Sequence, residues 1–221
     1  MTTVAPLDVS AADLSGYAVV TTDYVKRGVT QSDGSGAVQL GVDLAFDSGL
    51  YFGVWGSTVD IHNGSQQHRD LETNYYVGFG HDVGHRWNVS ANVVAYTYPG
   101  ADTYFDYDYF EYALTANFDD RIWIQYAYSP DLYNSGKESH NIELSGEWSI
   151  ASSWSVSAGL GYYDPSALTG SGYTYWQAGI TRHFDKLDID LRYHDTNRWV
   201  PIISTADRAK ERLVLGVRIP F

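Results

Sequence analysis

Residues 187–194 read LDIDLRYH, and their side chains alternate between two chemical characters. The apolar and aromatic residues share one parity: Leu187, Ile189, Leu191 and Tyr193. The residues between them are Asp, Asp, Arg and His. Since successive side chains of a β-strand point to opposite faces, this period of two predicts a strand with one apolar and one polar face. Whether the apolar face meets a core or lipid decides the class of fold.

The same alternation recurs from about residue 16 to the end and divides the chain into about twelve segments. The first is expected at residues 16–27 and the last at residues 210–221. Connections between segments are alternately short and long, which favours an up-and-down antiparallel barrel over a sandwich with Greek-key crossings. We therefore expect an all-β fold, with residues 1–13 as an N-terminal tail and residues 14–221 as one barrel domain.

Composition narrows the function classes. The 221 residues include 19 Tyr, 7 Trp and 21 Gly, as is typical of β-rich proteins, and the lack of Cys excludes disulfides and thiolate metal sites. The formal net charge of −13 argues against a nucleic-acid partner, which needs clustered Lys and Arg. No apolar run is long enough for a transmembrane helix. The first residues lack a signal-peptide pattern, so an exported protein would already have lost its signal.

The apolar parity is expected to face lipid, although a lipocalin-like barrel would place it inside. About twelve strands enclose more space than side chains fill, and the polar parity is small and acidic rather than Lys-rich. The aromatic residues also sort into two belts, as they do at the two interfaces of a bilayer. The turn-side belt is Phe46, Trp87, Phe118, Trp148, Trp154, Phe184 and Phe221. The loop-side belt is Tyr24, Phe110, Tyr128, Tyr162 and Tyr193.

An even number of strands places both termini at the short-turn rim, which is periplasmic in such barrels. These features predict a protein of the bacterial outer membrane. Its expected partners are outer-membrane lipids, lipopolysaccharide and small solutes.

Short motifs carry a resemblance to known families. Gly216, Ile219 and Phe221 at the C-terminus resemble the assembly signal of outer-membrane proteins, although Val214 stands where a polar residue is usual. The segments TDYVKRGVTQSDG (residues 22–34), GVWGS (53–57) and YPG (98–100) resemble the TorF-type porins, a family also described as conserved proteins of unknown function. The resemblance spans about residues 14–221. It implies an outer-membrane β-barrel that the barrel-assembly machinery recognises through its C-terminal strand, and it implies little about substrate.

The polar parity and its aromatic residues predict the lining of a pore. The candidates are Asp23, Arg27, Asp43, Glu72, Tyr76, Tyr96, Glu111, Arg121, Trp123, Glu143, Glu147, Tyr163, Asp188, Asp190, Arg192 and Arg218. Acidic residues outnumber basic ones, so we expect a narrow, mildly cation-favouring lumen. The same charges could instead brace the wall as cross-strand pairs. Asp23, Arg27 and Gln31 could form a constriction or fold the first loop inward, or Arg27 could simply pair with Asp23.

These observations predict a porin-like channel for passive diffusion of small hydrophilic solutes, with no catalytic residue, cofactor or metal. One alternative is a non-conducting barrel, closed by loops or by residues 1–13, with a structural or surface-binding role. A less favoured one is an outer-membrane hydrolase with a loop-side site, for which His62 and His68 with Asp60 and Asp70 are weak candidates.

Overall fold

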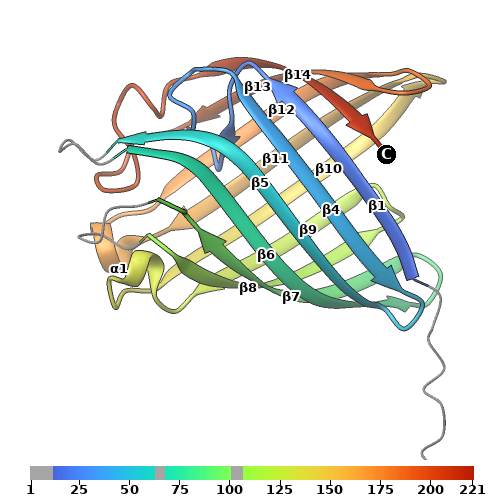
Figure 1. Cartoon of the computed structure of the whole chain (residues 1–221), viewed down its shortest axis with the longest axis horizontal. Coiled ribbons are helices and arrows are strands. Elements are labelled where there is room, and N and C mark those ends of the chain that lie inside the picture. The colour runs from blue at the N-terminus through green and yellow to red at the C-terminus, as the bar shows by residue number, and fades with distance from the viewer. Residues whose placement is uncertain (1–11, 63–67, 101–106) are drawn as a thin grey trace, which may run out of the picture.

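The chain folds into a closed antiparallel β-barrel of twelve strands (Figure 1). The computed structural model describes residues 12–62, 68–100 and 107–221. Its helical elements in this part of the chain are one turn each, α1 (Ser166–Thr169) and the 3-10 helix η1 (Leu132–Asn134). Across the same residues, no helix is both long and apolar enough to cross a membrane. The all-β prediction is confirmed.

Each strand of the wall pairs with its neighbours in the sequence, and β1 pairs with β14 to close the barrel. The strands are β1 (Ala12–Thr21), β4 (Ala37–Phe46), β5 (Leu50–His62), β6 (His68–Val83), β7 (Trp87–Thr97), β8 (Tyr109–Phe118), β9 (Ile122–Ser129), β10 (Ser139–Ala151), β11 (Trp154–Asp164), β12 (Tyr173–His183), β13 (Asp188–Thr196) and β14 (Arg212–Pro220). This is the up-and-down order that the connection lengths predict.

The first strand differs from the prediction of residues 16–27. β1 starts at Ala12 and ends at Thr21, and the chain then leaves the wall to form a two-stranded hairpin of β2 (Val25–Lys26) and β3 (Val29–Thr30). The Asp23 carboxylate accepts hydrogen bonds from the hydroxyls of Thr30 (2.5 Å) and Ser32 (2.8 Å), which fastens the base of this hairpin. Alternation continues into residues 22–27, so periodicity alone does not reveal the departure.

The apolar parity forms the outside of the barrel. Leu14, Leu160 and Leu213 are 73%, 56% and 66% exposed, and every strand of the wall contributes side chains of this kind. A continuous band of exposed aliphatic residues is the surface of a barrel that meets lipid, because water would oppose its exposure.

Both described ends of the chain lie at the short-turn end of the barrel (Figure 1). Gly16 and Phe221 exchange two backbone hydrogen bonds of 2.9 Å each, and the Phe221 ring lies over Gly16, where a Cβ would come within 2.5 Å of it. The terminal phenylalanine therefore seals the seam between β1 and β14.

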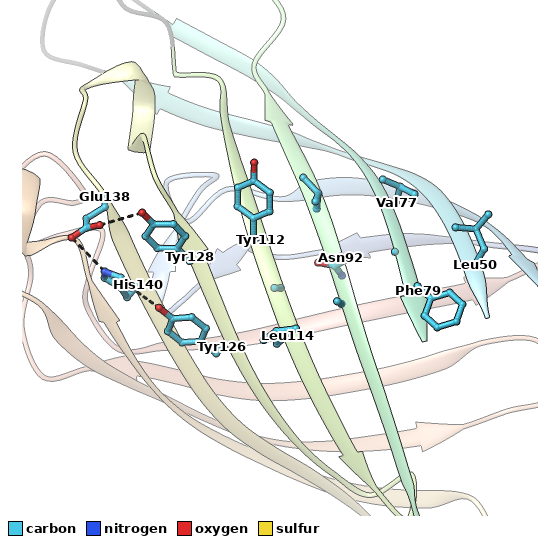
Figure 2. A pocket seen from close by; sticks show the side chains of 14 residues that line it. Leu50, Val77, Phe79, Asn92, Tyr112, Leu114, Tyr126, Tyr128, Glu138 and His140 are labelled. Atoms are coloured by element: carbon cyan, nitrogen blue, oxygen red, sulfur yellow. Dashed lines mark hydrogen bonds and ion pairs between the residues drawn. The ribbon is translucent and has the colours of Figure 1, made fainter. Parts of the chain in front are cut away.

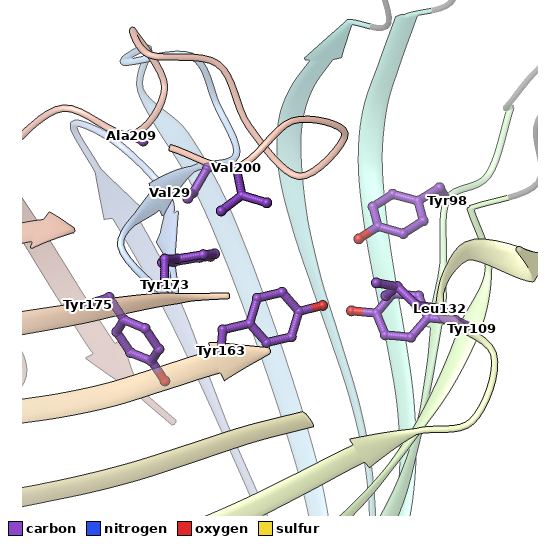
Figure 3. Packing of buried hydrophobic residues seen from close by; sticks show 9 residues of the cluster. All are labelled: Val29, Tyr98, Tyr109, Leu132, Tyr163, Tyr173, Tyr175, Val200 and Ala209. Carbon is purple, nitrogen blue, oxygen red and sulfur yellow. The ribbon is translucent and has the colours of Figure 1, made fainter. Parts of the chain in front are cut away.

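The buried hydrophobic core lies inside the barrel at its loop end. Residues from strands and from three loops converge there (Figure 3). They are Val29, Tyr98, Tyr109, Leu132, Tyr163, Tyr173, Tyr175, Val200 and Ala209. We call this set the mouth cluster. It divides the lumen into a filled loop-side mouth and an open turn-side vestibule.

Candidate functional site: the barrel lumen

Nearly all of the predicted pore-lining residues face the interior of the barrel, on the hairpin or on the inward parity of the strands. Arg121 differs, because it lies in the exposed turn between β8 and β9 at the rim. The remaining residues fall into two environments. Asp23, Arg27, Glu72, Glu111 and Tyr163 are gathered around the hairpin at the mouth, whereas the others line the vestibule or its walls.

The hairpin spans the lumen from one side to the other. At its tip, Arg27 and Gly28 have φ angles of +50° and +75°. A Cβ on Gly28 would lie 2.4 Å from the Thr196 side chain and 2.9 Å from Cβ of Tyr175, so the backbone touches β12 and β13. Arg27 reaches β8, which is four strands from β12 and five from β13 in the ring of twelve. The tip therefore bridges the barrel.

A buried ion pair holds the tip in place. Arg27 donates two hydrogen bonds, of 2.8 and 3.0 Å, to the two carboxylate oxygens of Glu111, and the side chains are 12% and 4% exposed. Its guanidinium also lies 4.7 Å from the centre of the Tyr163 ring. Bidentate pairs shielded from water are strong when both partners stay in place. Of the two arrangements that the sequence leaves open, the structure shows the inward-folded loop, with Asp23 paired to Arg212 at 3.2 Å instead of to Arg27.

Lys26 makes the neighbouring contacts. Its ammonium lies 3.6 Å from the centre of the Tyr96 ring, 3.1 Å from the Tyr109 hydroxyl and 3.8 Å from the Glu72 carboxylate. Burial lowers the pKa of Lys26, while the carboxylates of Glu72 and Glu111 act in the opposite direction. Lys26 was not among the predicted pore-lining residues, because in a strand of residues 16–27 its side chain would face lipid. The observed strand β1 ends at Thr21, so this parity does not apply to Lys26.

The loop between β13 and β14 covers the hairpin. The Arg208 carbonyl accepts from the Thr30 N–H at 3.1 Å, and its guanidinium donates to the carbonyls of Thr30 (3.2 Å) and Asp60 (2.8 Å). Where the mouth cluster packs around Lys26 and Arg27, the cavity that they share with it is about 40 Å³.

Below the hairpin, one side of the vestibule is aromatic. A cavity of about 380 Å³ is lined by tyrosines, a tryptophan and two asparagines. We call the set Tyr17, Tyr51, Trp55, Asn74, Tyr76 and Asn92 the aromatic wall. Three of its tyrosines stand directly across from a glycine on the next strand, in the pairs Tyr17 with Gly41, Tyr76 with Gly53 and Tyr51 with Gly78. A Cβ on any of these glycines would come within 2.6 Å of the tyrosine ring, so each ring lies over its glycine against the wall.

The opposite side of the vestibule is charged. It borders a cavity of about 480 Å³, and we call its residues Glu147, Asp188, Asp190, Arg192 and Arg218 the charged wall. Arg192 donates two hydrogen bonds of 3.0 Å to Asp190, and Arg218 lies 4.4 Å from the centre of the Tyr17 ring on the aromatic wall. This pair lies within β13 and is braced across to β12, where Thr181 donates to Asp190 and Gln177 accepts from Arg192, while the charges still border the cavity.

A Ser–His–Asp chain lies at the turn end of this wall. His183 is 2.8 Å from Asp188 through Nδ1 and 3.0 Å from the Ser155 hydroxyl through Nε2. Ser155 is 2% exposed and is not among the residues that border the cavity. A solute in the vestibule does not reach this hydroxyl, so the contacts link β11, β12 and β13 rather than form a nucleophilic site.

Eleven of the twelve expected interface aromatics project from the outer parity of the wall. Examples are Trp87 (45% exposed), Phe184 (49%) and Tyr162 (44%). Tyr24 is the exception, and its assignment to the loop-side belt is wrong. It stacks edge-on against Trp55 with ring centres 5.4 Å apart and borders both vestibule cavities. The reason is the early end of β1, which carries Tyr24 inward.

The outer face also has a depression of about 870 Å³ over β5–β10 (Figure 2). Its floor is apolar, and its loop-side end is polar. There the Tyr126 hydroxyl lies 2.7 Å from Nδ1 of His140, Tyr128 donates to Glu138 at 3.2 Å, and Nε2 of His140 is 3.8 Å from Glu138. This cluster lies at the level of the loop-side aromatic belt.

The weak loop-side candidates for catalysis are only partly visible. The side chains of His62 and His68 lie outside the described residues, while Asp60 and Asp70 take part in other interactions. Among the residues that the structure describes, no group of three or more His, Asp or Glu side chains is arranged to hold a metal ion.

Solved structures of similar fold include proteins that are named as porins or channels. The KdgM porin, in complex with disordered oligogalacturonate, is 8% identical, with 96% of this chain and 99% of that chain covered and a TM-score of 0.57. The NanC porin is 11% identical over 94% and 98% of the two chains, with a TM-score of 0.56. An outer membrane channel from Pseudomonas putida F1 is 14% identical over 99% of both, with a TM-score of 0.50. At these identities the similarity shows the fold alone.

Sequence comparison gives the family. None of the curated proteins matches the chain. One family model, described as a bacterial protein of unknown function (Gcw_chp), matches residues 7–215. Because this match covers nearly the whole barrel, the chain belongs to the Gcw_chp family.

Proposed function

We propose that this protein is a passive channel of the bacterial outer membrane, shown here with its loop-side mouth closed by the β2–β3 hairpin. The observation that carries the proposal is a water-accessible vestibule, with cavities of about 480 and 380 Å³, inside a barrel whose outside is apolar. A wall that is apolar outside and polar inside fits a solute path across a membrane. Both termini would then lie in the periplasm, and the loops outside the cell.

The fold supports a transport role without fixing the solute. The similar structures are named as porins and a channel. Charge argues for a different solute from the one in the KdgM complex, since oligogalacturonate is a polyanion. The cavity of about 480 Å³ is bordered by the carboxylates of Asp23 and three members of the charged wall, against the guanidiniums of Arg192 and Arg218. We propose small neutral or cationic hydrophilic solutes and a mild preference for cations.

A non-conducting barrel is the second candidate. The specific observation in its favour is the hairpin, whose tip contacts β8, β12 and β13 and borders a cavity of only about 40 Å³ at the mouth. In that case the function of the protein would reside in its loop surface, which would act as a structural or binding face. A hydrolase is a weaker third candidate, because the Ser155 hydroxyl is buried away from the cavity.

Single-channel recording in planar bilayers tests the proposal. The sharp variant replaces residues 25–30 by a two-residue Gly-Gly turn, which is geometrically feasible because Gln31 N–H already donates to the Tyr24 carbonyl at 2.6 Å. We expect the wild type to show brief or low-conductance openings and the variant to conduct steadily. Folded barrels of both kinds that carry no current would favour the non-conducting alternative.

Membrane partners follow from the same proposal. Lipids and lipopolysaccharide would cover the apolar band, and the polar end of the outer depression would lie among their headgroups. The seam of β14 with β1 would form last, with the C-terminal strand presented to the barrel-assembly machinery. The resemblance to the TorF-type porins stays a prediction that fits this location.

A further inference from the structure

The aromatic wall has a chemistry that passive diffusion alone does not require. Its rings come from β1, β5 and β6, and three of them are held over cross-strand glycines. A tyrosine that lies against a glycine is supported from behind, so one face of the ring is turned toward the lumen. The sequence uses a glycine opposite a tyrosine three times within this one region, which builds a broad π surface next to a cavity.

The polar groups beside these rings are several acceptors and one cation, the Lys26 ammonium, which lines the same cavity. Asn74 is 8% exposed, and among the described residues its amide oxygen and that of Asn92 accept no hydrogen bond. Their amide nitrogens are already used, because Asn74 donates to Glu72 at 3.0 Å and Asn92 donates to the Tyr51 hydroxyl at 3.2 Å. Tyr76 donates its hydroxyl proton to Asp43, so its oxygen is left as an acceptor. A buried acceptor without a donor is costly unless a ligand or water supplies one.

This combination selects a ligand class. The ligand must offer hydroxyl or other donors at its edge and an apolar face for the rings. A sugar ring has both, because its axial C–H groups form an apolar face and its hydroxyls radiate from the edge. A polyanion offers acceptors instead, and the Asp43 carboxylate and the unpaired amide oxygens disfavour it, while Lys26, the cation of this lining, is already held by Glu72 at 3.8 Å. The cavity of about 380 Å³ is also within the size range of small-molecule sites.

We infer that the aromatic wall is a binding site for neutral saccharides on the way through the lumen, with Trp55, Tyr51 and Tyr76 as stacking surfaces, since Arg218 already lies over the Tyr17 ring. The amide oxygens of Asn74 and Asn92, which are covered in this structure, accept hydrogen bonds from sugar hydroxyls once the neighbouring side chains move aside. The inference rests on the proposed channel for its biological setting, but binding can be measured without any current.

The test is equilibrium binding of maltotriose to the purified barrel in a detergent without a sugar headgroup. Binding is measured by calorimetry and by tryptophan fluorescence. We expect binding in the millimolar range, and no comparable binding of trigalacturonate. Trp55→Ala should weaken it by about tenfold or more, since a central aromatic contact is removed. Gly53→Ala should weaken it as well, because its Cβ would meet the Tyr76 ring at 2.2 Å and displace it.

The matched control is Trp123→Ala, which removes a tryptophan from the inward parity of β9, away from the aromatic wall, and should change the affinity by less than about twofold. Where Trp55→Ala does not fold, Trp55→Phe keeps a ring and should bind more weakly than the wild type. Equal losses in the Trp55 and Trp123 variants, or tighter binding of trigalacturonate, would overturn the inference. A conducting barrel that binds no maltotriose would contradict the saccharide site and leave the channel proposal intact. A barrel that binds maltotriose but carries no current would contradict the channel proposal and leave the site intact.

Discussion

The two ends of the lumen are built from the same strands but filled in opposite ways. At the loop end, the hairpin, three loops and the mouth cluster leave a cavity of about 40 Å³. At the turn end, the wall faces cavities of about 480 and 380 Å³. The strand pattern of inward glycines and aromatic residues is similar at both ends, as the pairs Tyr175–Gly161 at the mouth and Tyr76–Gly53 below it show. The wall sets the width of the lumen, and the inserted chain decides whether it is open.

The largest effect is expected from Glu111→Gln in β8. This change leaves the Arg27 guanidinium buried without its carboxylate, and breaking a buried ion pair in this way costs about 3–5 kcal/mol. We expect the cost to appear as release of the hairpin rather than as loss of the barrel, because the wall hydrogen bonds are untouched. Single-channel open probability should rise, and hydrogen exchange at residues 24–31 should accelerate. Unchanged exchange would show that the ion pair does not hold the hairpin.

A smaller effect is expected from Gly28→Ala at the hairpin tip. The new methyl group meets Thr196 and Tyr175, and alanine is strained at a φ of +75°, so we expect a cost of about 1–3 kcal/mol. Gly136→Ala is the control, because Gly136 has a φ of +69° with nothing within 4 Å of its Cβ position. Open probability should rise for the first variant only. Equal effects would mean that backbone strain, not contact with the far wall, is responsible.

Charge in the vestibule can be tested separately from closure of the mouth. Asp190→Asn removes the carboxylate that accepts two hydrogen bonds from Arg192 and leaves that guanidinium facing the cavity with Gln177 as its remaining acceptor. The reversal potential in a salt gradient should shift by a few millivolts toward anions. Asp195→Asn removes the same charge from the outer parity of β13, where Asp195 accepts from Tyr193, and should leave the reversal potential unchanged. A shift of equal size in both variants would mean that the charge acts from outside the lumen.

The strands of the barrel wall could be predicted from the sequence, whereas the hairpin and loops that fill the loop-side mouth of the lumen could not. Alternation is local, so Leu187–Tyr193 already separates an apolar from a polar face, and the number of strands and the two aromatic belts then indicate that the apolar face is outside. The path of Lys26 and Arg27 is set by partners far along the chain, Tyr109 and Glu111, each more than 80 residues away. No periodicity in residues 22–27 records those contacts. A basic pair before a glycine, Lys26-Arg27-Gly28, was the available signal, since it needs acidic partners and a tight turn.

The aromatic wall could be predicted only in part from the sequence. Tyr76 was expected in the lumen, but Tyr17, Tyr51 and Trp55 were not singled out. Their importance depends on which glycine stands opposite, and register between strands is a tertiary property. The pairing of an inward tyrosine with an inward glycine becomes readable only after the strands are aligned.

The smallest effect is expected from Asp119→Asn, at the other end of the same strand as Glu111. Arg86 donates to Asp119 in a bidentate pair of 2.7 and 2.5 Å, which resembles the Arg27–Glu111 pair in geometry. The side chains are 60% and 33% exposed, so solvent screens the pair, and Asn keeps the positive φ of this turn. Hydrogen bonding to Arg86 lowers the pKa of Asp119, so any stabilisation is present above the ordinary aspartate pKa and is lost as the pH falls. We expect no measurable change in the thermal midpoint or in open probability at neutral pH. A loss as large as that of Glu111→Gln would contradict the view that burial at the mouth, rather than ion-pair geometry, separates the two ends of the barrel.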